Sequence, residues 1–335
     1  SGVVVSTTVG SDGMWSATWA NGALEAGEYT TGVTLVSTDS FGNSTTVTDT
    51  LVVDTIAPLV EVTSGTDSVQ DFFNAQSFAG GVTLTGKGEP GASLLVTISG
   101  VEQSTTVGAD GMWSATWANG TLQAGEYSTG VTIVSSDSFG NTTTVTDTLI
   151  VDTISDVTVE TVSVEADGVV NAAEREDGVT LTGTAQPGST VVVSFGSGTH
   201  NATVDANGNW SADFAMSEVP SGETTATVTA TATDSYGNTS TSTGEVDIDT
   251  LVRDFGFTGT TGGTDSVINI AEAAQGLVMT GTTEPGSTVI VSMNGASHNA
   301  TVAADGTWTV SFSSSEIPSG TTVTTMTAVA TDAAG

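Results

Sequence analysis

The chain has 335 residues, of which 38 are Asp or Glu, 3 are Lys or Arg and none is Cys. The formal net charge of −35 excludes a basic surface for nucleic acid and disfavours binding to an anionic membrane. Disulfides and Cys-ligated metals are excluded as well. No apolar run approaches the roughly 18 residues of a membrane span. Such charge strains a compact chain by self-repulsion, which divalent cations would relieve.

A repeat of about 100 residues organises the chain. Trp15, Trp113, Trp210 and Trp308, each in an Asp/Asn-Gly-x-Trp motif, follow one another at intervals of 98, 97 and 98 residues. A unit of this length can close its own hydrophobic core, so the sequence predicts a string of small domains. The expected domains are a partial repeat at 1–55, repeats at 56–153 and 154–250, and a repeat at 251–335 that lacks its last strand.

Residues 1–55 match residues 99–153 at all but ten positions, so they are the C-terminal part of a repeat. Half a sandwich would expose its core. The chain is therefore expected to be a window on a longer repeat array.

Short segments of alternating apolar and polar residues predict strands in every repeat. In the second repeat, Val82, Leu84 and Gly86 share one face, and Leu94, Val96 and Ile98 follow after a Pro-Gly turn. The Asp-Gly pair before Trp is typical of a tight hairpin. An Asp-Ser-aromatic-Gly-Asn turn comes later, and Val/Ile-Asp-Thr ends the last strand. No segment keeps a helical period beyond one turn.

About seven short strands in 100 residues, with turns every 8–12 residues, predict an all-β fold of tandem Ig-like β-sandwiches. Only a few residues separate the end of one repeat from the start of the next. Linkers this short restrict the angle between neighbours, so the sequence predicts an extended rod.

Aromatic residues recur four positions apart, which puts both rings on one face of a strand. The pairs are Trp15 and Trp19, Trp113 and Trp117, Trp210 and Phe214, and Trp308 and Phe312. Exposed rings would form a sugar-stacking platform. Recurrence at a fixed place in every repeat favours a place in the sandwich core instead.

Taken together, these turns resemble the bacterial Ig-like domains of giant repetitive adhesins and biofilm-associated proteins, which are secreted by type I systems. Residues 154–250 carry the pattern in full, from Asp167-Gly168 through Gly178–Gly183, Pro187-Gly188, Asn207–Trp210 and Asp234–Asn238 to Asp249-Thr250. The resemblance covers the whole chain. It implies an extracellular or cell-surface location and calcium at the domain junctions.

Three groups of oxygen-bearing side chains are the calcium ligands that the resemblance implies. They are the junction residues Asp54, Asp152 and Asp249, the early-loop residues Asp67, Asn74, Asp167, Asn171, Glu174, Asp265, Asn269 and Glu272, and Asp39, Asp137 and Asp234 of the aromatic-Gly-Asn turn, placed near the same end of the sandwich. Calcium takes six to eight hard oxygens in loose geometry, which such loops supply.

Two observations weigh against individual ligands. Asp and Asn also make Asx-turns and cap loops without any metal. In the second repeat Ser77 replaces the early-loop Glu, so this site is weakened, rebuilt with Asp71 or absent. Asp205–Asn209 begins like an EF-hand loop but lies on the hairpin turn and lacks the closing Glu.

The sequence indicates a structural protein and no enzyme. His200 and His298 occupy the same place in successive repeats, a domain apart, so they cannot share a site, and no nucleophile elbow is present. We expect an adhesin extender whose partners are its neighbouring repeats. The alternatives are a self-assembling fibre, matrix or surface layer of many copies, and a carbohydrate-binding module.

Overall fold

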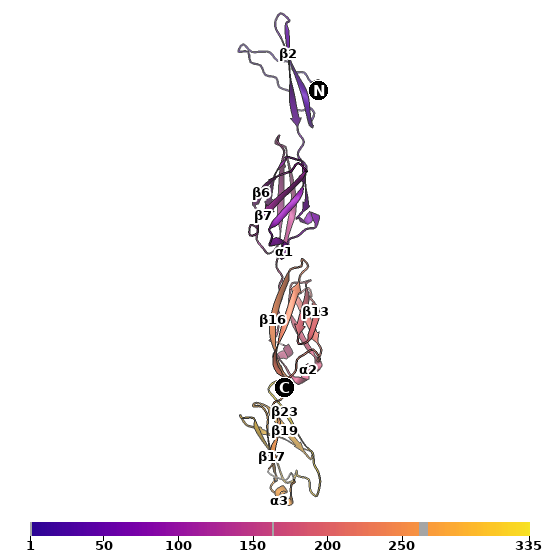
Figure 1. Cartoon of the computed structure of the whole chain (residues 1–335), viewed down its shortest axis with the longest axis vertical. Helices are drawn as coiled ribbons and strands as arrows, with labels where there is room; N and C mark the ends of the chain where they lie inside the picture. Colours follow the sequence, from indigo (N-terminus) through magenta and orange to yellow (C-terminus); the bar gives the residue numbers. More distant parts are fainter. Residues whose placement is uncertain (1, 163, 261–266) are drawn as a thin grey trace. The chain divides into compact units, whose positions relative to one another are not determined.

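The computed structural model describes residues 2–162, 164–260 and 267–335. The chain divides into two compact units, residues 1–154 and 155–335, which Figure 1 colours from indigo to magenta and from magenta to yellow. Each unit is described by itself. No helix among the described residues is long and apolar enough to cross a membrane.

The first unit begins with a two-stranded hairpin and continues with a complete sandwich. The hairpin pairs β1 (Glu28–Thr38) with β2 (Ser44–Asp54) over their full lengths. The sandwich has seven strands: β3 (Val60–Ser64), β4 (Val82–Gly88), β5 (Ser93–Ile98), β6 (Val101–Thr106), β7 (Met112–Trp117), β8 (Glu126–Ser136) and β9 (Thr142–Asp152). They form the sheets β3-β4-β7 and β6-β5-β8-β9.

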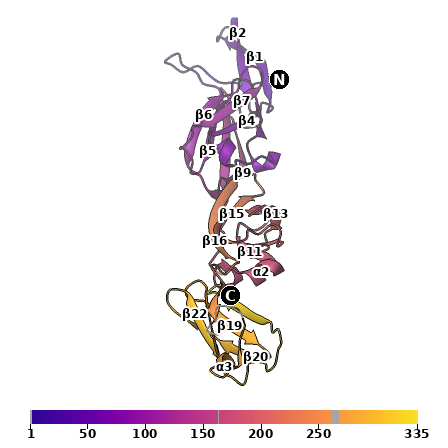
Figure 2. The same cartoon turned by 60° about the horizontal axis from the view of Figure 1, so that its bottom comes forward.

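The third repeat, in the second unit, has the same architecture. Its strands are β10 (Val169–Val170), β11 (Val179–Thr184), β12 (Thr190–Phe195), β13 (Gly198–Thr203), β14 (Asn209–Phe214), β15 (Glu223–Thr233) and β16 (Thr239–Asp249). One sheet pairs β11 with β14, and the other runs β10-β16-β15-β12-β13. Figure 2 shows the long β15 and β16 side by side.

The fourth repeat completes the second unit. Its described strands are β17 (Gly256–Thr260), β18 (Leu277–Thr282), β19 (Thr288–Met293), β20 (Ala296–Asn299), β21 (Thr301–Val302), β22 (Thr307–Phe312) and β23 (Met326–Thr331). They form the sheets β17-β18-β22-β21 and β20-β19-β23. Each of the last three repeats thus pairs two antiparallel-dominated sheets, and the prediction of all-β Ig-like sandwiches is confirmed.

Each complete repeat encloses its own core between its two sheets. In the second repeat, Leu84 and Trp117 from one sheet and Ile133 and Leu149 from the other are fully buried. Separate clusters surround Trp210 in the third repeat and Trp308 in the fourth. The aromatic pairs of these three repeats are therefore core residues, as the sequence predicts.

The core prediction is wrong for the first aromatic pair. Trp15 is 47% exposed and Trp19 is 41% exposed, whereas their counterparts Trp113 and Trp117 are buried. In the second repeat β7 carries this pair and hydrogen-bonds to β4. Residues 2–55 contain no strand equivalent to β4, so the first pair has no opposite sheet to pack against.

Short helices were missed by the sequence analysis. The structure contains η1 (Asp67–Val69), α1 (Ala75–Phe78), η2 (Val164–Ala166), α2 (Ala172–Asp177) and α3 (Ile270–Ala273). Each α-helix has one turn or slightly more and begins at an Asn with a capping box. The Asn-x-x-Glu spacing of a capping box, which was interpreted as a ligand pattern, predicts α2 and α3, whereas at α1 Ser77 takes the place of the Glu.

Candidate metal centre

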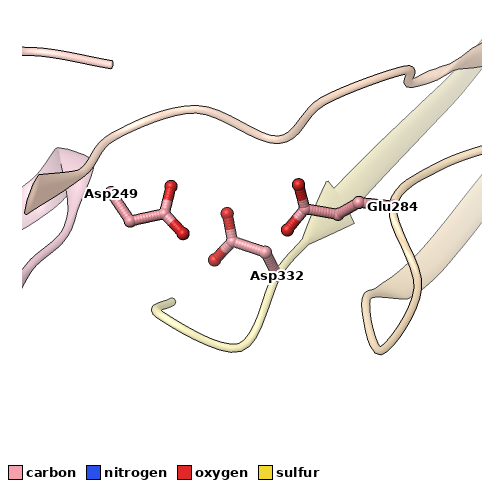
Figure 3. A group of neighbouring side chains, drawn as sticks. All are labelled: Asp249, Glu284 and Asp332. Carbon is pink, nitrogen blue, oxygen red and sulfur yellow. The ribbon is translucent and has the colours of Figure 1, made fainter. Parts of the chain in front are cut away.

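Three carboxylates converge where the third repeat ends and the fourth begins. Asp249, Glu284 and Asp332 each contribute an oxygen, and these oxygens all lie within 4.8 Å of one another. Figure 3 shows the three side chains pointing toward one another. None of the three is fully exposed. Anions this close repel one another, so the arrangement favours a bound cation.

The strand registers explain why these residues meet. Asp249 is the last residue of β16, and β15 places Glu223 directly opposite it. In the fourth repeat, the Pro-Gly turn with Glu284 leads into β19, and Asp332 follows β23 directly. The pairing of Thr288 with Thr331 brings that turn and Asp332 to the same end of the sheet.

The donor set at this place fits calcium. Asp249 Oδ1 is buried and has no hydrogen-bond partner among the described residues. Asp332 Oδ1 accepts hydrogen bonds from the backbone N–H groups of Ala334 and Gly335, both at 3.0 Å. A buried carboxylate oxygen without a partner is costly. Hard carboxylate oxygens are the ligands that calcium prefers.

The first unit carries the equivalent carboxylates, although three of their oxygens do not converge within 4.8 Å there as they do in the second unit. Glu89, in the Pro-Gly turn of the second repeat, occupies the place of Glu284. Burial raises its pKa, and the carboxylates of Asp137, Glu28 and Asp54 raise it further. Asn141 Nδ2 also donates to the carbonyl oxygen of Asp54 at 3.4 Å. In both units the end of one repeat and two loops of the next therefore carry neighbouring carboxylates, and in the second unit their oxygens converge.

The junction and early-loop residues that the sequence predicts do come together in the second and third repeats. β10 runs parallel to the end of β16, with Val170 opposite Ile248, so Asn171 lies beside Asp249. Phe73 bridges Val151 in the same parallel manner, which places Asn74 beside Asp152. Asp152 is buried, and its Oδ1 accepts from Ile154 N at 3.2 Å. Asp54 Oδ1 accepts from Ile56 N in the same way.

The early-loop oxygens are engaged in local hydrogen bonds. Asn171 Oδ1 accepts from the N–H groups of Ala173 and Glu174, and Glu174 Oε2 accepts from Asn171 N. Asn269 and Glu272 repeat this capping box. The remaining candidates are placed as follows: Asn74 caps α1 with Ser77, Asp67 begins η1, Asp167 Oδ1 accepts from Val169 N, and Asp265 lies outside the described residues.

The third group was placed at the wrong end of the sandwich. Asp234 lies in the turn between β15 and β16, whereas Asp249 ends β16, about 33 Å away at ~3.3 Å per residue. Asp39 and Asp137 lie in the equivalent turns. In all three turns a carboxylate oxygen of the Asp accepts a hydrogen bond from the backbone N–H of the Asn four residues later. In the second repeat this turn lies at the junction to the preceding repeat, because Asn141 Nδ2 donates to the carbonyl oxygen of Asp54, and Asp137 and Asp54 both raise the pKa of Glu89.

Glu284, Asp332, Glu89 and Glu28 were missed as candidates. A signal for two of them exists in the sequence, because Glu precedes Pro-Gly at both Glu89 and Glu284. In the third repeat Gln186 takes this place. The signal was overlooked because the Pro-Gly turn was considered only as a turn.

The two His residues belong to separate hydrogen-bonded pairs. His200 Nε2 lies 3.0 Å from Glu218 Oε1, and His298 Nε2 lies 2.8 Å from Glu316 Oε1. The ring of His298 packs edge-on against Phe312, with centroids 4.9 Å apart. Glu316 also accepts from Ser313 N at 2.7 Å, which is the main reason that its pKa is lowered to about 2. In the third repeat the pair connects the turn after β14 to the edge strand β13, and in the fourth it connects the turn after β22 to the edge strand β20.

Comparison with known proteins identifies the domains. Residues 154–247 and 265–335 match the sequence profile of the bacterial Ig domain. No curated protein matches the chain.

Three similar solved structures are parts of adhesins. A Ca2+-stabilized adhesin that helps an Antarctic bacterium bind ice is 29% identical over 97% of this chain and 86% of its own, with a TM-score of 0.39. A 1.5-MDa bacterial ice-binding adhesin is 28% identical over 78% and 89%, with a TM-score of 0.40. An immunoglobulin-like domain from the M. primoryensis ice-binding adhesin is 35% identical over 28% and 95%, with a TM-score of 0.23. By the profile match, residues 154–247 and 265–335 belong to the bacterial Ig domain family, whose domain the chain repeats in tandem.

Proposed function

We propose that this chain is a spacer segment of a secreted or surface-attached bacterial adhesin, with calcium bound where one repeat meets the next. The observation that carries the proposal is the convergence of Asp249, Glu284 and Asp332, whose counterparts recur at the same positions of the first unit. Glu28, Asp54, Glu89 and Asp137 form the set in the first unit. Glu223, Asp249, Glu284 and Asp332 occupy the same places in the second.

Bound calcium would act mechanically. Asp249 ends one repeat, whereas Glu284 and Asp332 lie in two loops of the next, so an ion held by all three ties the repeats together. It would also neutralise part of the net charge of −35. A ligand that binds only the folded state adds stability by mass action, about 2.7 kcal/mol at 100 times its Kd.

The adhesin role is supported by the family and by what the similar proteins are named for. Tandem domains that each close their own core supply length without requiring a catalytic residue. The proteins similar to this chain at 28–35% identity are named as adhesins, and one of them as Ca2+-stabilized. We extend that role, and the extracellular location that comes with it, to this chain.

The test is small-angle scattering and calorimetry of the whole chain, first with calcium and then with excess chelator. We expect chelation to lower the melting temperature and to broaden the distribution of molecular dimensions. Glu284→Gln should remove part of the calcium-dependent rise in melting temperature, because it neutralises one of three converging carboxylates. Glu174→Gln is the matched control, since Gln keeps the oxygen that accepts from Asn171 N.

Identical dimensions and melting curves in the two conditions would contradict the calcium proposal. A larger loss from Glu174→Gln than from Glu284→Gln would move the site to the early loops. Sedimentation of the same samples addresses the alternative of self-assembly. Particles that persist on dilution, without any response to calcium, would favour a fibre or matrix of many copies over a spacer.

A further inference from the structure

One of the three basic residues of the chain lies inside the acidic junction of the second unit. Arg253 follows β16 and its Nε forms an ion pair with Glu223. The same Nε lies 3.5 Å from Glu284 Oε2, and the Arg253 backbone N–H donates to that oxygen at 3.2 Å. A guanidinium thus bridges a carboxylate of the third repeat and one of the fourth.

The position of Arg253 is specific to this junction. Arg253 comes four residues after Asp249. The residues four places after Asp54 and Asp152 are Pro58 and Asp156, so neither of those linkers carries a cation at this place. Arg175, the other arginine, instead donates to the carbonyl oxygens of Val219 and Pro220 within the third repeat.

Burial separates this contact from a chance surface pair. The side chain of Glu284 is 15% exposed and that of Glu223 is 29% exposed, although Arg253 itself is 60% exposed. Partly buried carboxylates keep more of their attraction to a cation than exposed ones do. Arginine suits the place because its charge is permanent and its planar group presents several donors.

We propose that Arg253 is a tethered counter-ion that holds the junction between the third and fourth repeats together at calcium concentrations where the first junction loosens. In the first unit, Glu89 faces Asp137, Glu28 and Asp54, and no described basic side chain is paired with them. There an external cation must supply all the positive charge. At the other junction Arg253 pairs with Glu223 and Glu284 and neutralises part of their charge, so a divalent ion held by Asp249, Glu284 and Asp332 has less negative charge left to balance. The inference rests on the proposed calcium sites and adds that the junctions of one chain differ in calcium dependence.

The absence of Cys allows each junction to be measured separately in the full chain. Spin labels on introduced cysteines at the exposed positions Thr48 and Ser104 would report the first junction. Labels at the equivalent exposed positions Thr243 and Asn299 would report the other. Distance distributions are recorded by double electron–electron resonance over a series of free calcium concentrations. Melting temperatures of the labelled chains show that each repeat remains folded.

Chelation should broaden the Thr48–Ser104 distribution and leave the Thr243–Asn299 distribution narrow. Arg253→Gln should make the second pair broaden on chelation like the first, and Pro58→Arg should keep the first pair narrow. Equal broadening of both distance distributions on chelation, unchanged by Arg253→Gln, would overturn the proposed role of Arg253 and leave the calcium proposal standing. If calcium changes neither junction but Arg253→Gln still broadens the second, the proposed function fails and the counter-ion is supported.

Discussion

Glu316 shows how a single side chain fastens one part of a repeat to another. It accepts hydrogen bonds from Ser313 N and Ser313 Oγ, and it pairs with His298 on β20. Glu218 and His200 make the same connection in the third repeat. In the second repeat Gln103 and Thr121 occupy these places, so the pair exists only in the last two repeats of the described chain.

We predict that the stability of the fourth repeat depends on pH through Glu316. Its pKa is lowered from 4.5 to about 2 in the folded chain. The contribution to stability is therefore fully present above pH 4.5 and is lost as the pH falls from 4.5 toward 2. Calorimetry between pH 7 and pH 2 should show Glu316→Gln melting lower than the parent at neutral pH and converging with it near pH 2. Glu102→Gln, at an exposed position of β6, is the control. A constant difference between Glu316→Gln and the parent at every pH would contradict this.

At the scale of elements, one glycine lets an edge strand approach the core tryptophan. Gly86 on β4 lies over the ring of Trp113, and a Cβ there would be 2.5 Å from two ring carbons and would collide with the carbonyl oxygen of Glu61 on β3. Trp113 Nε1 also donates to that oxygen at 3.2 Å. Gly183 and Gly281 stand in the same relation to Trp210 and Trp308.

We predict that Gly86→Ala destabilises the second repeat by about 1–3 kcal/mol, as overpacking of a core does. For a domain of this size that is a fall in melting temperature of roughly 4–8 °C per kcal/mol. Gly130→Ala is the matched control, since a Cβ on Gly130 meets no atom within 4 Å. Thermal unfolding followed by Trp fluorescence measures both variants. Similar melting temperatures for the two variants would contradict this prediction, because they would show that β3 moves away from the added Cβ without loss of stability.

The strands of the fold were largely predictable because apolar and polar residues alternate along them with a period of two. The inward residues Val82, Leu84 and Gly86 of β4 are read directly from the sequence, and the structure buries Val82 and Leu84. The one-turn helices were not predictable from periodicity, because a helix of four to six residues cannot show a period of 3.6. Their N-caps, Asn74, Asn171 and Asn269, carry the information instead.

At the scale of the whole chain, the candidate site was predictable only in part. Asp249 was identified because it repeats with Asp54 and Asp152 at the end of a strand. Its partners Glu284 and Asp332 belong to the next repeat, and a pattern within one repeat does not show which end of the next one it meets. The strand directions decide this, since β16 carries Asp249 to the end opposite the turn of Asp234.

The separate cores predict that repeats unfold one at a time under force. The clusters around Trp117, Trp210 and Trp308 share no residue, and each lies within one repeat. Pulling the chain from its ends should therefore give discrete events, each releasing on the order of 300 Å of chain for a repeat of about 95 residues at 3.3–3.6 Å per residue. Gly86→Ala should lower the force of one event and leave the others unchanged, because independent domains do not share the cost of a local defect. A single concerted rupture, or a lower unfolding force in every event, would contradict this prediction. It would mean that the junctions couple the repeats into one cooperative unit.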